Sequence, residues 1–124
     1  NGLQLNGKII YALRTLASLW DNVEESVLVE AAQEWEGVSD PARLAQALFS
    51  KKHWRMVIYN AAASIIASSS KTYFRHNLHE IVQYKGIGRG ILKNVSEFVD
   101  SGDLQSHAWL LSANAEIPIP AHEI

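Results

Sequence analysis

Apolar residues recur at spacings of three and four along this chain, and this periodicity constrains the fold more than any other feature of the sequence. Near the start, the apolar positions are Leu5, Ile9, Leu13, Leu16 and Trp20. The spacing places these side chains on one face of an α-helix. No alternating run of Val, Ile and Thr is bounded by turn residues, so the signals for β-strands are weak. We therefore predict an all-α fold, a compact helical bundle around one core.

Six further segments are predicted to be helical, and most have a recognisable start or stop. They are residues 24–36, a helix that starts at Asp40-Pro41, and residues 51–68, 77–83, 89–99 and 103–113. The carboxylate of Asp40 can cap free amides, and proline fits the first helical turn. Gly37 and Gly102 are typical helix stops. Residues 116–124 contain Ile117-Pro118-Ile119-Pro120 and are expected to form an extended tail.

The predicted core draws on aromatic and aliphatic residues from several helices. We expect the four tryptophans to anchor it: Trp20, Trp35, Trp54 and Trp109. The third helix is expected to bury Leu44, Ala47 and Leu48. The fourth is expected to bury Trp54, Val57, Ile58, Ala61, Ala62, Ile65 and Ile66. Five residues are predicted to lie buried together, namely Ile58, Ile65, Ile87, Leu92 and Val95.

The positive charge of the chain is concentrated in one segment. Eight of its 11 Lys and Arg residues lie between residues 51 and 95, where Glu80 is the one acidic residue. The net charge of -2 therefore hides a basic segment between two acidic ones. Polyanion binding depends on local clusters of charge more than on the total. The segment is predicted to bind a polyanion, and the alternative is that its charges are scattered over different faces.

The most informative stretch is a short apolar helix, then Gly86-Ile87-Gly88, then a second apolar helix. Two glycines let the backbone turn sharply and approach another backbone closely. Free N–H groups at the start of the second helix would form an anion site. Such a site suits a phosphate diester and reads no base edges, so we expect sequence-independent DNA binding. The predicted DNA-binding residues here are Lys85, Gly86, Ile87, Gly88, Arg89, Gly90 and Lys93. The alternative is a helix corner used only for packing.

Three segments resemble the N-terminal, lyase-type domain of the family X DNA polymerases, the relatives of polymerase beta. They are Leu5-Asn6-Gly7 with its helix, residues 58–67 around Tyr59, and the hairpin with the helix that ends at Gly102. The resemblance covers about half of the chain, and Mus-type nucleases carry a similar domain. It implies a SAM-like helix-hairpin-helix bundle over residues 1–115, with a helical insertion at about residues 23–50. Arg55 and Tyr59 match family DNA-binding positions.

The sequence departs from the family at the residue that carries the chemistry. The family forms a Schiff base from a lysine six residues after the second hairpin glycine, and that position is Asn94 here. An amide nitrogen is not nucleophilic at neutral pH, so we expect lyase activity to be lost. Two alternatives stay open: a 5′-deoxyribose-phosphate or abasic-site lyase that uses a displaced amine such as Lys93 or Lys52, and a protein-interaction module.

The resemblance also implies a cofactor and partners. In the family the hairpin holds a monovalent cation, Na⁺ or K⁺, on backbone carbonyls, and the matching residues are Val82, Tyr84 and Ile87. The expected partner is DNA, together with a catalytic domain in the same or a partner chain. We expect no membrane partner, since no apolar run approaches the ~20 residues that span a bilayer. Without Cys, no disulfide or thiolate site can form, and we expect an intracellular protein, nuclear if eukaryotic.

Overall fold

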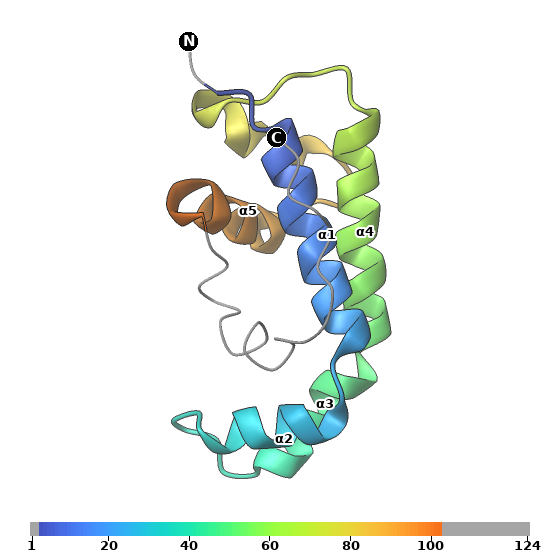
Figure 1. The fold of residues 1–124 in the computed structure, drawn as a ribbon, viewed down its shortest axis with the longest axis vertical. Helices are drawn as coiled ribbons and strands as arrows, with labels where there is room; N and C mark the ends of the chain where they lie inside the picture. The colour runs from blue at the N-terminus through green and yellow to red at the C-terminus, as the bar shows by residue number, and fades with distance from the viewer. Residues whose placement is uncertain (1–2, 103–124) are drawn as a thin grey trace.

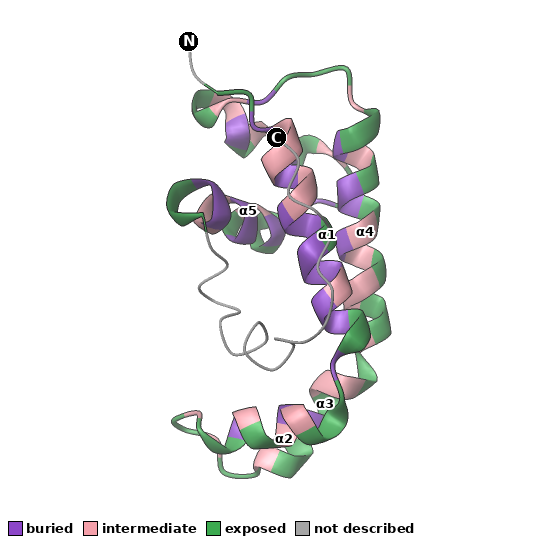
Figure 2. Ribbon diagram, in the orientation of Figure 1, coloured by how far each residue is buried: buried purple, intermediate pink, exposed green. Residues whose placement is uncertain are grey.

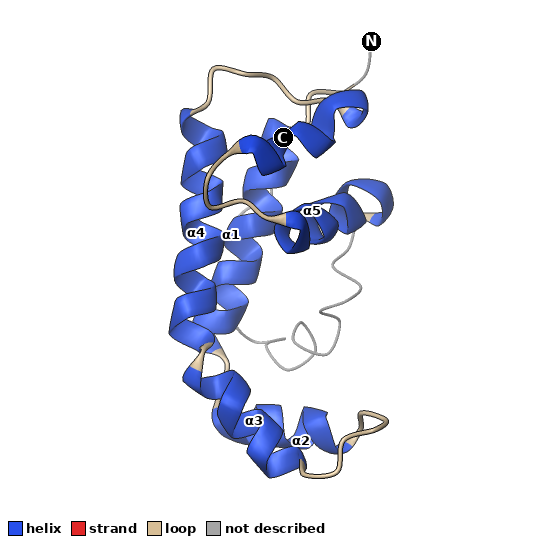
Figure 3. Ribbon diagram, turned by 180° about the vertical axis from the view of Figure 1, so that it is seen from behind, coloured by secondary structure: helices blue, strands red, loops and turns tan. Residues whose placement is uncertain are grey.

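The computed structural model describes residues 3–102, and every regular element within this range is a helix (Figure 3). The helices are α1 (Asn6–Asn22), α2 (Glu25–Gln33), α3 (Pro41–Ser50), α4 (Lys52–Ser68), the 3₁₀ helix η1 (Arg75–Gln83) and α5 (Arg89–Ser101). The all-α prediction is confirmed. The helix expected at residues 103–113, the tail at 116–124 and Trp109 lie outside the described residues.

α1 and α4 run antiparallel, side by side, at the centre of the fold (Figure 1). Every predicted apolar position of α1 is buried, and Ile9, Leu13 and Leu16 are completely so. Facing them, α4 buries the small residues Ala62 and Ala63. Each large aliphatic side chain buried in this way contributes about 1.5–3 kcal/mol. The sequence periodicity of the first helix therefore identified the central packing face.

The buried face of α4 differs from the predicted one. Tyr59, Ala62, Ala63 and Ile66 are its buried residues. Trp54 is 63% exposed, and Val57 and Ala61 are also exposed, so the prediction that they face the core is wrong. Helix α4 is apolar over a wide arc, while its packing partner α1 covers only one side of it. Periodicity shows that an apolar face exists, but the position of the partner helix selects which part is buried.

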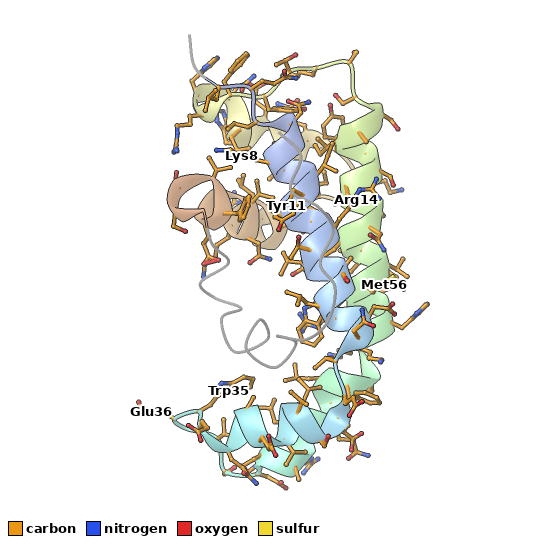
Figure 4. All side chains as sticks on the ribbon, viewed as in Figure 1. Lys8, Tyr11, Arg14, Trp35, Glu36 and Met56 are labelled. Carbon is orange, nitrogen blue, oxygen red and sulfur yellow. The ribbon has the colours of Figure 1, made fainter. Side chains whose placement is uncertain are left out.

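α2 and α3 pack against each other and form a helical hairpin beyond the end of the α1–α4 pair (Figures 1 and 2). The Asp40 carboxylate accepts a hydrogen bond from the backbone N–H of Arg43 at 3.1 Å, which confirms the predicted cap. Ala45 is the buried residue of α3, whereas Ala47 is exposed, contrary to the prediction. Trp35 lies near the tip of this hairpin and is only half-buried (Figure 4).

α5 lies across α1 (Figures 1 and 3). Its buried residues include Ile91, Phe98 and Val99. The Phe98 ring contacts Tyr11 of α1 with 5.5 Å between centroids, and Figure 4 shows Tyr11 on the side of α1 that faces α5. Gly102 adopts a φ of 75° and ends the helix, as its sequence position predicted. This packing fixes the direction in which the N-terminus of α5 points.

Two of the five residues predicted to lie buried together do so. Ile87 and Val95 are buried in the core, at 3% and 0% exposure. Ile58, Ile65 and Leu92 are half-buried and pack against its edge. The reason is the same as for α4: these three side chains stand at the margin of the helix contacts, where one flank remains open to solvent.

Candidate nucleic-acid interface

The chain reverses between η1 and α5 in a tight turn. The backbone N–H of Ile87 donates to the carbonyl of Tyr84 at 3.1 Å. Gly86 has a φ of 102°, which an L-residue adopts only with strain, and Ile87 inserts its side chain into the core. Gly88 has an extended backbone with a φ of -98°. The predicted hairpin turn is confirmed, but only Gly86 needs to be glycine for the sake of the backbone.

The start of α5 leaves its amides open. Gly88 is the N-cap residue, and no side chain among the described residues caps this end. The first N–H groups of an α-helix have no partner within the helix and carry a partial positive charge. A Cβ atom built on Gly88 or on Gly90 would meet nothing within 4 Å. The Cβ positions of Gly88 and Gly90 thus face open space, so no described side chain blocks the approach of a phosphate from these two directions.

Three cations lie near this helix end along the chain: Lys85 before the turn, Arg89 at the first position of α5, and Lys93 one turn later. Lys85, Arg89 and Lys93 are all exposed, and within residues 3–102 none of them forms an ion pair. Their side chains are free to bring positive charge to an anion at the amides. The structure thus brings together all seven hairpin residues that the sequence predicted as DNA contacts, with Ile87 serving as the buried anchor.

Three other basic residues of the segment 51–95 are less available, whereas Lys51 is exposed. Lys52 donates to carbonyl groups at the C-terminal end of α1, at 3.1 Å to the oxygen of Asp21. Lys71 pairs with Glu80, and Arg75 pairs with a carboxylate of α5. Each of these three side chains already has a partner, although the two ion pairs are at the surface, where such pairs add little stability. The alternative of scattered charge therefore describes these three residues. Lys52 and Lys93 are also the two candidate amines for a displaced lyase. The Lys52 amine is engaged in the hydrogen bonds just described, whereas Lys93 is exposed.

Arg55, Tyr59 and Asn94 form a polar cluster where α4 meets α5. The Asn94 amide donates to the Tyr59 hydroxyl at 3.0 Å, and both residues are buried, at 8% and 7% exposure. Burial raises the pKa of Tyr59, and this effect is opposed by the Arg55 charge and by the Asn94 hydrogen bond. The Arg55 guanidinium stacks over the Trp20 ring at 4.8 Å. Asn94 thus places an amide, not an amine, next to the tyrosine.

The residues expected to hold a monovalent cation on their backbone carbonyls are Val82, Tyr84 and Ile87, which lie in and just before the turn. The Tyr84 carbonyl accepts one hydrogen bond, from Ile87, and a carbonyl oxygen has a second lone pair. Among the described residues the Ile87 carbonyl has no hydrogen-bond partner. The residue Val82 is 37% exposed. The carbonyls of Tyr84 and Ile87 thus keep lone pairs that are not used by the described residues.

Two contacts of one hairpin side chain were missed from the sequence. Tyr84 was named only for its carbonyl, but its side-chain hydroxyl lies 2.6 Å from the Ser69 hydroxyl and accepts a hydrogen bond from Tyr73 at 2.8 Å. No local sequence pattern links side chains that are separated by eleven and fifteen positions.

Comparison with models of known protein families, with curated proteins and with solved structures finds no match to this chain. Among the described helices, none combines the length and the apolar character needed to cross a membrane.

Proposed function

We propose that this domain binds DNA through the phosphate backbone, independently of base sequence, at the hairpin formed by residues 84–93. The observation that carries the proposal is the open N-terminus of α5 beside three exposed cations that have no ion-pair partner in the described residues. A corner used only for packing would gain nothing from this combination. Its cations could pair with acids, as Lys71 does with Glu80.

The chemistry of the surface suits a phosphodiester. Backbone amides at a helix N-terminus donate to phosphate oxygens, and the helix dipole favours negative charge there. Arg89 and Lys93 add charge on the same helix, and Lys85 precedes the turn. Between residues 84 and 93 the exposed side chains other than glycine are those of Lys85, Arg89 and Lys93, cations that suit contacts with phosphate. A K⁺ or Na⁺ ion on the carbonyls of Val82, Tyr84 and Ile87 would add further positive charge near the phosphate.

The resemblance to family X polymerases supports a role in DNA repair or replication, beside a catalytic domain in the same or a partner chain. Such a role implies an intracellular location, which is the nucleus in a eukaryote. The amide of Asn94 at the position of the family's Schiff-base lysine favours binding without lyase chemistry.

The proposal is tested by fluorescence anisotropy with single-stranded, gapped and duplex oligonucleotides of two unrelated sequences. A hairpin of this size contacts ~3–5 phosphates, so log Kd plotted against log salt should change with a slope of magnitude about 3 to 4. The two sequences should give the same affinity. A slope near zero, or no binding at low salt, would remove DNA as the partner.

A further inference from the structure

Three hydroxyl groups meet at the start of the hairpin, and one of them belongs to Tyr84, its first residue. The Tyr73 hydroxyl donates to Tyr84 at 2.8 Å, and the hydroxyl oxygens of Tyr84 and Ser69 are 2.6 Å apart. The backbone N–H of Lys71 donates to the same Ser69 oxygen at 3.1 Å. Tyr84 and Ser69 share the remaining hydrogen bond, in which either hydroxyl can be the donor. The bonds therefore form a continuous chain of hydroxyl groups from Tyr73 through Tyr84 to Ser69.

Both ends of this hydroxyl chain are attached to the central helices. Ser69 is the C-cap residue of α4. Tyr73 is buried, and its backbone is held at the start of α1: its N–H donates to the Asn6 side chain at 2.8 Å, and its carbonyl accepts from the Leu5 N–H at 2.7 Å. The side chain of Tyr84 thus ties the hairpin to the ends of α4 and α1.

The backbone of Tyr84 in turn sets the turn that follows. Its carbonyl accepts the N–H of Ile87, and Gly86 lies between them with its positive φ. The rings of Tyr84 and Tyr73 pack edge to face with 6.5 Å between centroids. Two side chains therefore hold the hairpin in place. Ile87 is held by burial in the core, and Tyr84 by hydrogen bonds.

We propose that Tyr84 is a positioning residue for DNA binding: its hydroxyl, held between Ser69 and Tyr73, keeps the amides at the start of α5 in the arrangement that receives a phosphate. This inference rests on the proposed function. In this role Tyr84 does not contact phosphate. Its loss lowers the fraction of molecules with a formed hairpin, and the apparent affinity falls by that fraction. The bound state keeps its phosphate contacts, so the salt slope stays the same.

The test compares the double variant Tyr73→Phe/Tyr84→Phe with the single variant Tyr73→Phe. Tyr84→Phe alone would leave the buried Tyr73 hydroxyl without its partner, which destabilises the whole domain. Replacing both partners of a hydrogen bond by apolar groups of the same shape is nearly neutral. The single variant keeps the bond between Tyr84 and Ser69 and serves as the matched control. Three quantities are measured: the thermal midpoint, hydrogen exchange of the Ile87 amide, and DNA affinity across a salt series.

The double variant should melt near the wild-type temperature, exchange the Ile87 amide about tenfold faster and bind DNA at least about threefold more weakly, with an unchanged salt slope. The control should stay close to wild type in all three. The inference would be overturned if the double variant kept wild-type exchange of the Ile87 amide and wild-type DNA affinity. A reduced salt slope would also overturn it, because that result would make Tyr84 a phosphate contact. If wild-type protein fails to bind DNA, the proposed function fails, while exchange of the Ile87 amide still reports whether Tyr84 holds the hairpin.

Discussion

Substitution of the two hairpin glycines by alanine should separate a glycine required by the fold from a glycine required by the ligand. At Gly86 a Cβ would lie 3.6 Å from the Ile65 side chain, which is an ordinary contact, so sterics cost nothing. The φ of 102° does cost energy, because an L-residue there is strained by roughly 1–2 kcal/mol. Gly86→Ala should therefore lower the urea midpoint by about 0.5–1 M for an m-value of ~2 kcal/mol per molar.

At Gly88 the same substitution should leave stability almost unchanged. The φ of -98° is open to any residue, and a Cβ meets nothing within 4 Å. Alanine restricts the unfolded chain, which stabilises by about 0.4–1 kcal/mol, but it is a poorer N-cap by a similar amount. A side chain here stands in front of the amides, however. Gly88→Val should weaken DNA binding about tenfold, the effect of losing one hydrogen bond to a charged phosphate.

Gly37→Ala is the matched control for backbone strain. Its φ is 76°, its Cβ would meet nothing, and it lies in the α2–α3 hairpin, away from α5. This variant should lose stability as Gly86→Ala does and keep wild-type DNA affinity. Urea titration and anisotropy on the same samples measure both quantities. Equal destabilisation by Gly86→Ala and Gly88→Ala would refute the backbone argument, and wild-type binding by Gly88→Val would refute the amide site.

Three other outcomes are expected. Lys93→Ala should reduce the magnitude of the salt slope of DNA binding by about 1. The control Arg43→Ala removes the same charge from the exposed surface of α3 and should leave the slope unchanged. Equal effects of the two variants would mean that only net charge matters. Borohydride should not trap the natural protein on abasic-site DNA. The variant Asn94→Lys should be trapped, because it places an amine beside the Tyr59 hydroxyl. Trapping of both proteins to the same extent would show that another lysine is the nucleophile. Burial, followed by the hydrogen bond to its neighbouring tyrosine, raises the pKa of Tyr73 to about 12, above its ordinary value of 10.0. The raised folded-state pKa means that its stabilisation is complete below pH 10.0 and is lost as the pH rises through about 12, so phenolate absorbance should show a late step that Tyr73→Phe removes.

Local sequence rules were sufficient where the cause is itself local. Asp40 followed by Pro41 predicted a cap that the structure contains, because both effects act within one helical turn. Gly86 predicted the hairpin turn, and Gly102 predicted the end of α5, because a positive φ favours glycine whatever surrounds it. The central stripe of α1 was also predicted correctly, because that helix is packed on more than one side and buries nearly everything apolar on it.

Tertiary structure alone decided which apolar and polar groups meet. Trp54 and Ala47 follow helical periodicity but point away from the helices that pack against their own. The contacts from Asn94 to Tyr59 and from Tyr84 to Ser69 join residues 35 and 15 positions apart. By itself, the sequence determined the helices, their ends and the chemistry of the hairpin, since these depend on neighbours along the chain. The buried faces and the hydroxyl chain depend on how α1, α4 and α5 cross, and the energy of that crossing is a sum over side chains that no single segment contains.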